Sequence, residues 1–158
     1  MLKISEVHIR NAIKDDIPLL KQIFYRAIHE VCSEDYSIEE RSVWSSSIKN
    51  ENRWLEAVTN QYFLVAIYKK QIIGFASLQN NNHIDFLFID PSYTGLGVAK
   101  RLIVEIFNYK HIEDRLTAYV SKTALPFFEQ QGFNVIRENK NQREGVVLIN
   151  YLMERSSI

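Results

Sequence analysis

The chain has 158 residues, of which 46% are hydrophobic and 24% charged, a composition typical of one globular domain with a substantial core. Its 19 basic and 19 acidic side chains cancel, so bulk charge gives no reason to expect a nucleic acid or an anionic membrane as a partner. No apolar run approaches the length of a signal peptide or a membrane span, and a lone cysteine, Cys32, excludes an internal disulfide. We therefore expect one soluble, cytoplasmic domain over residues 1–158, with a core at about 6–154.

The chain begins with a strand pattern and then a helix pattern. Alternating apolar residues predict a strand over 6–12. Helical spacing of apolar residues predicts an amphipathic helix over 17–31, with an N-cap offered by Lys14–Asp16 and Pro18 in its first turn. Such a helix is expected to pack on a sheet.

Two further helical pieces are rich in aromatic residues. Ser37 and Glu40 form a capping box at the start of the second piece, which carries Trp44, and a third piece carries Trp54. Together with Tyr36, these tryptophans are either core anchors or the wall of a binding pocket. The sequence leaves both readings open.

Three strand patterns follow, joined by short polar turns. Residues 62–68 and 71–78 are joined by Lys69–Lys70, and Asn80–Asn82 form the next turn. Gly74, inside the second strand, indicates a bulge or a close approach of backbone. The segment is therefore predicted to be an antiparallel meander.

The third strand of the meander leads into the most informative stretch of the chain. An apolar run over 84–89 ends at Pro91, and a loop of small residues then precedes a helical stripe, which comprises Val98, Leu102, Ile103, Ile106 and Phe107. The first N–H groups of a helix have no internal partner and carry partial positive charge, so they bind anions. With Lys100 and Arg101 beside them, a pyrophosphate is the expected ligand.

After this helix the pattern predicts a strand, a helix and two last strands. The strand covers 116–120, Thr123 is the better N-cap for the helix, and Gly132 closes it. The last strands are expected over 133–137 and 146–153, around a polar turn at Glu138–Gly145.

The loop after the apolar strand resembles the motif of one family and differs from two other phosphate-binding motifs. A Walker loop fails because no Gly-Lys-Ser/Thr occurs, and a dinucleotide fingerprint fails because the glycines do not follow the strand directly. The order strand, Asp90–Pro91, Thr94–Ala99, helix resembles the acyl-CoA-binding motif of the GCN5-related N-acetyltransferase family. A second stretch, Ala124–Phe133, resembles another motif of that family, with Phe128 where a tyrosine is usual.

The resemblance extends to the order of elements along nearly the whole chain, and it implies both a fold and a cofactor. The fold implied is α/β (α+β), a mixed and mostly antiparallel central sheet of about seven strands flanked by helices. The donor implied is acetyl-CoA, with no metal. The residues implied to bind it are Leu87, Phe88, Ile89, Thr94, Gly95, Leu96, Gly97, Val98, Ala99, Lys100, Ser121 and Phe128.

The reaction implied is direct transfer of an acetyl group to a primary amine, which requires a base. Strand alternation places His83, Asp85, Leu87 and Ile89 on one face, and His83 matches the position of the glutamate base in histone-type members. A phenyl ring at position 128 has no proton to give, so either another group protonates the leaving thiolate, first Tyr119 and after it Tyr93, or the thiolate leaves unaided.

Acceptor residues are expected in the aromatic segment, at Tyr36, Trp44 and Trp54. The acceptor itself is a small molecule or a peptide end, and the sequence does not distinguish polyamines, amino acids, antibiotics and peptides. Edge strands also allow a homodimer. An alternative function is a catalytically weak acyl-CoA sensor, which Thr94 and Phe128 motivate because they depart from the family motifs.

Overall fold

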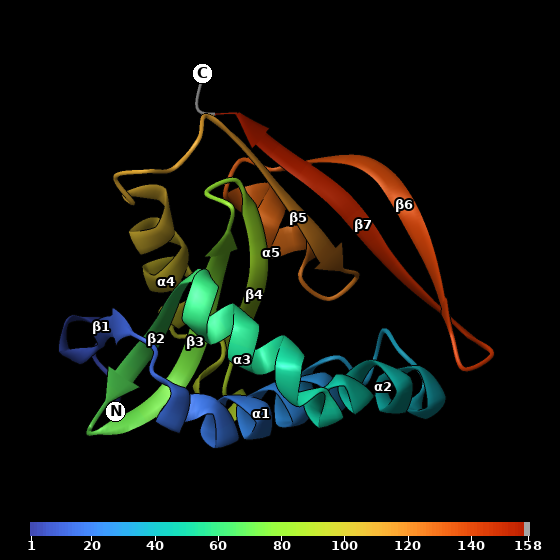
Figure 1. Cartoon of the computed structure of the whole chain (residues 1–158), viewed down its shortest axis with the longest axis horizontal. Coiled ribbons are helices and arrows are strands. Elements are labelled where there is room, and N and C mark those ends of the chain that lie inside the picture. Colours follow the sequence, from blue (N-terminus) through green and yellow to red (C-terminus); the bar gives the residue numbers. More distant parts are fainter. Residues whose placement is uncertain (157–158) are drawn as a thin grey trace.

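The sheet that organises the molecule contains seven strands in the computed structural model, which describes residues 1–156 (Figure 1). The helices and strands, in chain order, are β1 His8–Asn11, α1 Ile17–Arg26, α2 Ile38–Ser45, α3 Glu51–Asn60, β2 Tyr62–Tyr68, β3 Gln71–Gln79, β4 His83–Ile89, α4 Val98–Phe107, β5 Arg115–Ser121, α5 Leu125–Gln130, β6 Asn134–Arg143 and β7 Val146–Ser156. Within these residues no helix is long and apolar enough to span a bilayer.

The strands lie in the order β1-β2-β3-β4-β5-β7-β6. Every neighbouring pair is antiparallel except β4 and β5, which are parallel and are joined through α4. A parallel pair needs such a crossover because the chain must return to the same end of the sheet. The sheet is therefore mixed and mostly antiparallel, as predicted.

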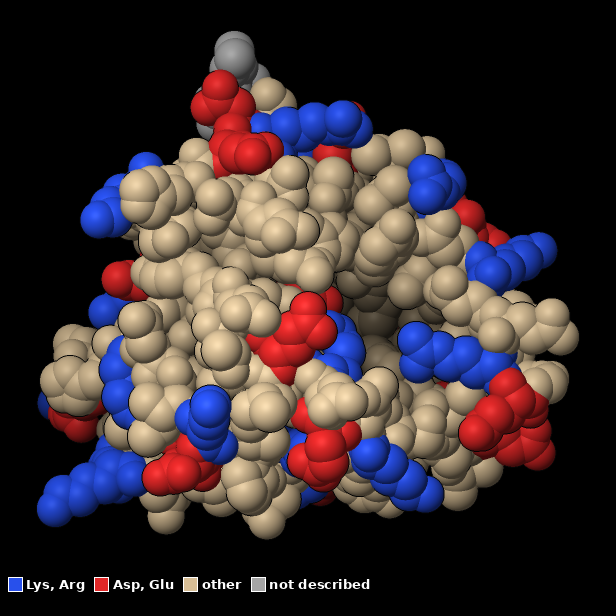
Figure 2. All heavy atoms as spheres, in the orientation of Figure 1, with Lys and Arg blue, Asp and Glu red and all other residues tan. Residues whose placement is uncertain are grey.

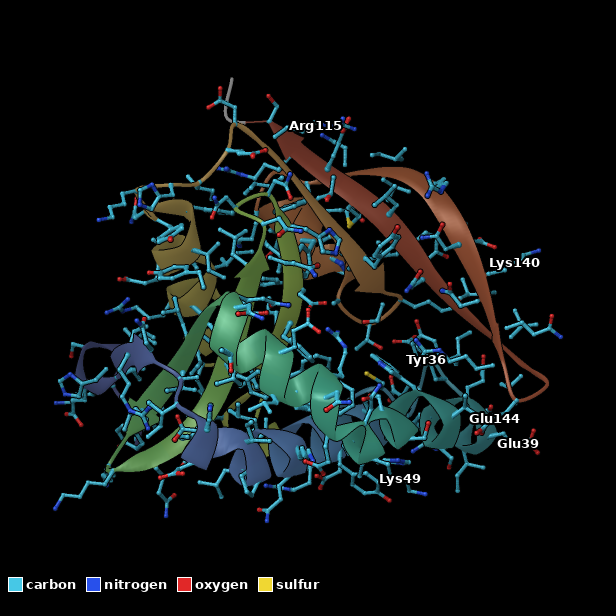
Figure 3. The ribbon with its side chains drawn as sticks, viewed as in Figure 1. Tyr36, Glu39, Lys49, Arg115, Lys140 and Glu144 are labelled. Atoms are coloured by element: carbon cyan, nitrogen blue, oxygen red, sulfur yellow. The ribbon has the colours of Figure 1, made fainter. Side chains whose placement is uncertain are left out.

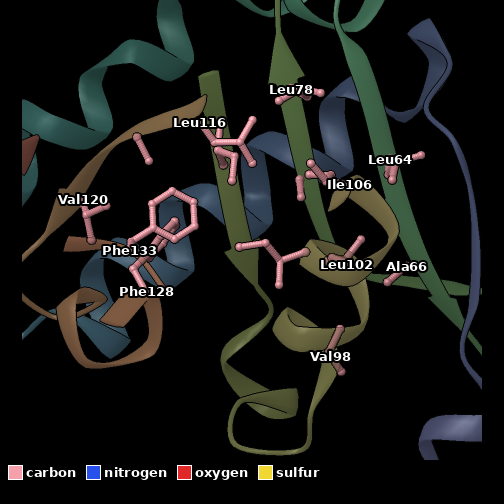
Figure 4. Packing of buried hydrophobic residues seen from close by; sticks show 14 of the residues in the cluster. Leu64, Ala66, Leu78, Val98, Leu102, Ile106, Leu116, Val120, Phe128 and Phe133 are labelled. Carbon is pink, nitrogen blue, oxygen red and sulfur yellow. The ribbon is translucent and has the colours of Figure 1, made fainter. Parts of the chain in front are cut away.

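Each face of the sheet has its own apolar cluster. On one face the stripe of α4 packs with α5 against the strands, and Figure 4 shows Leu102 and Ile106 over the sheet with Phe128 and Phe133 beside them. On the other face α1 and α3 cover β3 and β4 through Leu20, Trp54 and neighbouring aromatic rings. The two clusters fix the positions of the strands between them.

Close packing explains the glycine inside β3. A Cβ atom at Gly74 would lie 2.7 Å from Ile89 Cδ1 and 3.2 Å from the Phe88 carbonyl oxygen. The register between β2 and β3 also skips Ile73, so a bulge adjoins the glycine. Both features that the sequence suggested at this position are present.

The predicted boundaries hold best in the meander. β2 spans the predicted residues 62–68, and β3 and β4 each differ from prediction by one residue at one end. The first strand is shorter than predicted because residues 4–6 form a 3₁₀ turn, and the first helix changes to a π-helical turn at Ala27–Val31. The capping box of Ser37 and Glu40 is confirmed.

Two local predictions in the C-terminal part are wrong. Thr123 does not cap α5; its hydroxyl donates to Asp35 (2.7 Å), while the Ser121 oxygen accepts the Ala124 N–H. The polar turn over 138–145 is not a turn, because β6 continues to Arg143 and only two residues connect it to β7. Nearly every residue of β6 is solvent-exposed, so this edge strand has the polarity of a loop.

Tyr36 joins the helical side of the molecule to the strands on the far side of β4. Its buried hydroxyl donates to the Ile149 carbonyl of β7 (2.6 Å) and accepts the Lys122 N–H after β5 (3.0 Å). Figure 1 shows the far end of the β6–β7 hairpin reaching α2, which contacts β7. This hydroxyl is thus a fixed link across the opening described below.

We predict that Tyr36→Phe lowers the free energy of unfolding by about 1–3 kcal/mol, because two partly buried backbone groups lose their partner. Chemical denaturation of both proteins measures the difference. Tyr25→Phe is the matched control, since Tyr25 is exposed and its contact is to the His29 ring. Equal stability of the Tyr36 and Tyr25 variants would contradict a structural role for the Tyr36 hydroxyl.

Candidate active site

The central feature of the site is a divergence of two parallel strands. β4 and β5 pair only at His83–Thr117 and Ile84–Ala118, although each strand runs for several residues more. Beyond these two pairs, the edge of β4 that faces β5 has no partner strand within residues 1–156. A cavity of about 740 Å³ occupies the opening. Its volume is in the range of cofactor and ligand sites.

The glycine loop forms one end of this cavity. Gly95 and Gly97 have φ values of 74° and 89°, a region that side chains disfavour, and Gly97 is the N-cap of α4. A Cβ at Gly95 would meet nothing within 4 Å, and one at Gly97 only Ile4 at 3.8 Å, so both backbones are open to a ligand. No side chain caps this helix, so its first N–H groups have no side-chain partner, a condition under which a helix N-terminus can bind an anion.

The charged and hydroxyl side chains beside the loop differ in whether they already have a partner within the protein. Lys100 lines the cavity and is exposed, whereas Arg101 is ion-paired with Glu105 at 3.1 Å. Thr94 also lines the cavity, and its hydroxyl donates to the Pro91 carbonyl at 3.2 Å. Lys100 is therefore the cation that is available to a phosphate.

A bulge in β4 overturns part of the predicted strand face. The register with β3 passes from Ser77–Phe86 to Leu78–Ile84, so Asp85 is the extra residue. Leu87 and Ile89 pack with the α4 cluster, while Asp85 bonds to Arg53 of α3 on the other side. Strict alternation therefore fails here, and His83 and Asp85 do not share a face with Leu87 and Ile89.

Asp85 is held in a network of hydrogen bonds at the mouth of the opening. Both of its oxygens accept from Arg53, at 2.8 and 3.0 Å, and Gln61 donates a third bond at 2.7 Å. Burial by itself raises the pKa of the Asp85 carboxyl, but the bonds from Arg53 and Gln61 outweigh it and hold the pKa below its usual value. The Asp85 carboxyl is thus ionised, its negative charge is balanced by the paired arginine, and its side chain is held in place.

His83 lies next to this network but lines neither of the two cavities described for the site. Its Nδ1 shares a hydrogen bond with the Thr117 hydroxyl (2.8 Å), and its ring meets Tyr119 edge-on at 5.4 Å. Burial lowers the pKa of His83, an effect that Asp85 opposes and Arg53 reinforces. The imidazole is therefore neutral at pH 7 and able to accept a proton.

The far wall of the opening carries the ring at the usual tyrosine position. Phe128 is buried, packs edge-on against Phe133, and lines the cavity. Tyr93 and Tyr119 also line it, and Tyr119 is 54% exposed. Ser121 lines it as well, and its oxygen already accepts one backbone N–H. The hydroxyl-bearing residues Tyr93, Tyr119 and Ser121 thus line the same cavity as Phe128.

A second, smaller cavity of about 190 Å³ lies between the helices and the β6–β7 hairpin. Tyr36 and Trp44 line it, as the sequence suggested, and burial raises the pKa of Tyr36 to about 12. Figure 2 shows the surface hollowed between the helical side and the β5 side, with Lys or Arg side chains at the mouth. Trp54 lines neither cavity; it is fully buried in the core and donates to the Ser47 carbonyl.

The two cavities meet at a common set of residues. Those that line both are Trp44, Asp85, Phe88, Tyr119 and Ser121. A ligand extending along β4 from the glycine loop and a second ligand entering between the helices and the hairpin would therefore come together here. This is the geometry that a two-substrate transfer requires.

Most of the residues predicted to bind the cofactor line the larger cavity, with Leu96 as the exception. The sequence analysis missed several residues that line the smaller cavity, namely Arg53, Asn141, Arg143 and Asn150. Three of these lie on the hairpin whose first strand was read as a turn. A shorter turn at Glu144–Gly145, between an extended polar run and an extended apolar run, was the sequence signal that could have indicated this hairpin.

Comparison with known proteins agrees with this geometry. A family model described as an acetyltransferase (GNAT) domain matches residues 32–155. YafP of Escherichia coli K12, named as an uncharacterised N-acetyltransferase, is 35% identical over 149 residues, which cover 94% of this chain and 95% of that protein.

Solved structures share the fold over nearly the whole length. A GCN5-related N-acetyltransferase from Rhodopseudomonas palustris superposes with a TM-score of 0.90 at 28% identity and 99% coverage of both chains. PaiA N-acetyltransferase from Thermoplasma acidophilum, solved in complex with coenzyme A, gives a TM-score of 0.74 at 22% identity, with 95% of this chain and 98% of that chain covered. From its family match and its relative, this chain belongs to the GCN5-related N-acetyltransferase family.

Proposed function

We propose that the protein transfers the acetyl group of acetyl-CoA directly to a small primary amine while both substrates are bound. The observation that carries this proposal is the meeting of two cavities at Asp85, Phe88 and Tyr119, beside a strand edge and an open helix N-terminus. The volume of the second cavity, about 190 Å³, favours a small acceptor over a macromolecule.

The residues of the larger cavity fit the proposed donor. The amides of Val98, Ala99 and Lys100 and the glycine backbone would hold the pyrophosphate. The free edge of β4 at Leu87–Ile89 would lie along the pantetheine arm and polarise the acyl carbonyl, a kind of donor typically worth about 10²–10³-fold in rate. Acetyl-CoA supplies the thioester to be attacked.

Proton transfers are assigned to the groups around the meeting point. The amine must lose a proton, and His83, which lines neither cavity, takes it through water because its lowered pKa keeps it neutral. Asp85 keeps its charge and orients the site rather than accepting the proton. Tyr119 returns a proton to sulfur, since Phe128 has none to give.

A catalytically weak acyl-CoA sensor is the second candidate, and the buried Phe128 ring favours it. Release of free CoA thiol with a panel of amines separates the two functions. Thiol release that depends on the amine supports the enzyme. Tight CoA binding without turnover on any amine supports the sensor and contradicts the enzyme.

Gly97→Trp should abolish the binding of CoA. The substitution forces a side chain into a left-handed conformation and covers the backbone that receives the phosphates. Calorimetric titration with CoA measures the effect. Gly145→Trp, also at positive φ but in the hairpin turn, is the control for strain and should still bind CoA. Unchanged affinity in the Gly97 variant would remove the loop from the donor site.

His83→Gln should lower kcat/KM by about 10²-fold or more near neutral pH. In the native enzyme the rate should fall only below about pH 6.5, as the imidazole protonates through its lowered pKa. The variant should lack this acid limb. His111→Gln, at an exposed histidine, serves as the control. If the His83 variant keeps the native pH profile, His83 is not the base.

Phe128→Tyr should preserve or raise turnover, because the ring borders the cavity and a hydroxyl there gains access to the sulfur. Phe133→Tyr puts the same group into the core and should instead lower stability by about 1–3 kcal/mol. Steady-state rates and thermal unfolding of both variants make the comparison. A large loss of turnover in a folded Phe128→Tyr protein would show that the phenyl ring itself is required.

A further inference from the structure

One wall of the smaller cavity comes from the β6–β7 hairpin and is rich in hydrogen-bond donors. Register pairs Asn141 with Leu148 and Asn139 with Asn150, so alternation puts these residues and Arg143 on one face of the hairpin. Arg143, Asn141, Leu148 and Asn150 line the cavity. The hairpin therefore presents a guanidinium and two amides to an acceptor.

The charge on this wall is not neutralised by the protein. Arg53, the other arginine of the cavity, is paired with Asp85 through both of its terminal nitrogens. Arg143 makes no ion pair, side-chain hydrogen bond or ring contact with any residue in the described range 1–156. The charged groups lining the smaller cavity, Arg53, Asp85 and Arg143, thus leave one net positive charge, and Arg143 carries it.

The amides next to Arg143 also have unused donors. Asn141 donates to the Asn150 oxygen at 3.3 Å, which leaves the Asn150 nitrogen free to donate. The Asn139 nitrogen is buried and has no partner within residues 1–156. Asn139 does not line the cavity, so a ligand oxygen there would accept from Arg143 and from the Asn150 nitrogen.

The opposite side of the cavity carries several aromatic rings beside the paired Arg53 and Asp85. Phe24, Trp44, Phe86 and Phe88 line the cavity from the helical and β4 sides. Of these, Trp44 and Phe88 also border the larger cavity, whereas Arg143 borders only the smaller one. The cavity therefore runs from the proposed transfer point, past aromatic rings, to the guanidinium at its hairpin end.

From this arrangement we propose that the acceptor is a small primary amine whose other end carries a carboxylate, separated from the amine by an aromatic or apolar body and held by Arg143. This inference rests on the proposed acetyltransferase function. Arginine suits the role because its planar fork matches a carboxylate with two parallel hydrogen bonds. Polyamines are disfavoured, because a second ammonium group would face Arg143.

Two matched sets of amines test the acceptor class. The aromatic set is 4-(aminomethyl)benzoate, benzylamine and 1,4-bis(aminomethyl)benzene, and the aliphatic set is 5-aminopentanoate, pentylamine and 1,5-diaminopentane. Within at least one set, kcat/KM for the carboxylate should exceed that of the neutral-ended amine and the diamine by about ten-fold or more. Equal rates across both sets, or preference for the diamines, would overturn the proposal.

Two substitutions test whether Arg143 causes the preference for amines that carry a carboxylate. Arg143→Gln should remove the difference between the carboxylate and the neutral-ended amine, mainly through KM. Lys140→Gln removes the same charge from the other face of β6, where Figure 3 shows Lys140 on the outer side of the hairpin, and should leave the preference intact. If both variants reduce the preference equally, the effect is one of general charge and not of a site.

A measurement of amine binding distinguishes failure of this inference from failure of the proposed function. The same amines are titrated by calorimetry into protein saturated with CoA. About ten-fold tighter binding of a carboxylate amine that Arg143→Gln abolishes supports the inference even if no acetyl transfer occurs, which would contradict the enzyme alone. Binding without preference, or no binding by either set, overturns the inference whatever the turnover.

Discussion

The structure depends on one constraint, that two parallel strands pair for two residues and then separate. An apolar cluster on each face of the sheet holds β4 and its neighbours in place, so the opening is a fixed property of the packing. The bulge at Asp85 falls where the pairing with β5 stops. As a result, a strand edge, the N-terminus of α4 and the end of β5 all face a single cavity. Tyr36 then bridges from the helical side to Ile149 and Lys122.

The network around Asp85 explains how a partly buried carboxylate is tolerated at the meeting point of the cavities. Arg53 and Gln61 satisfy both oxygens, and Arg53 also lies over the Phe86 ring at 4.6 Å. The network ties α3 to β4 and leaves no net charge there. The uncompensated charge of the smaller cavity is instead on Arg143 of the hairpin. The proposed donor and acceptor sides thus differ in chemistry: backbone amides line the first, and side chains of late strands line the second.

The sequence analysis identified many residues that line the larger cavity and few of those that line the smaller one, for physical reasons. Glycines at positive φ, a helix N-terminus and an apolar strand are local features, so Gly95, Gly97 and α4 were found where they lie. The bulge at Asp85 depends on the register with β3, which a single strand does not reveal. The exposed edge strand β6 has a loop-like composition, and this hid Asn141 and Arg143. Trp54 shows that an aromatic residue alone does not distinguish a core from a pocket.

Amide hydrogen exchange with and without acetyl-CoA tests most directly whether the opening between β4 and β5 is the donor site. The account predicts slower exchange, on adding acetyl-CoA, at the amides of Leu87–Ile89 and Gly95–Lys100, with little change in β1 or β2. No added protection in those two segments, or protection confined to other parts of the chain, would contradict the assignment of acetyl-CoA to this opening.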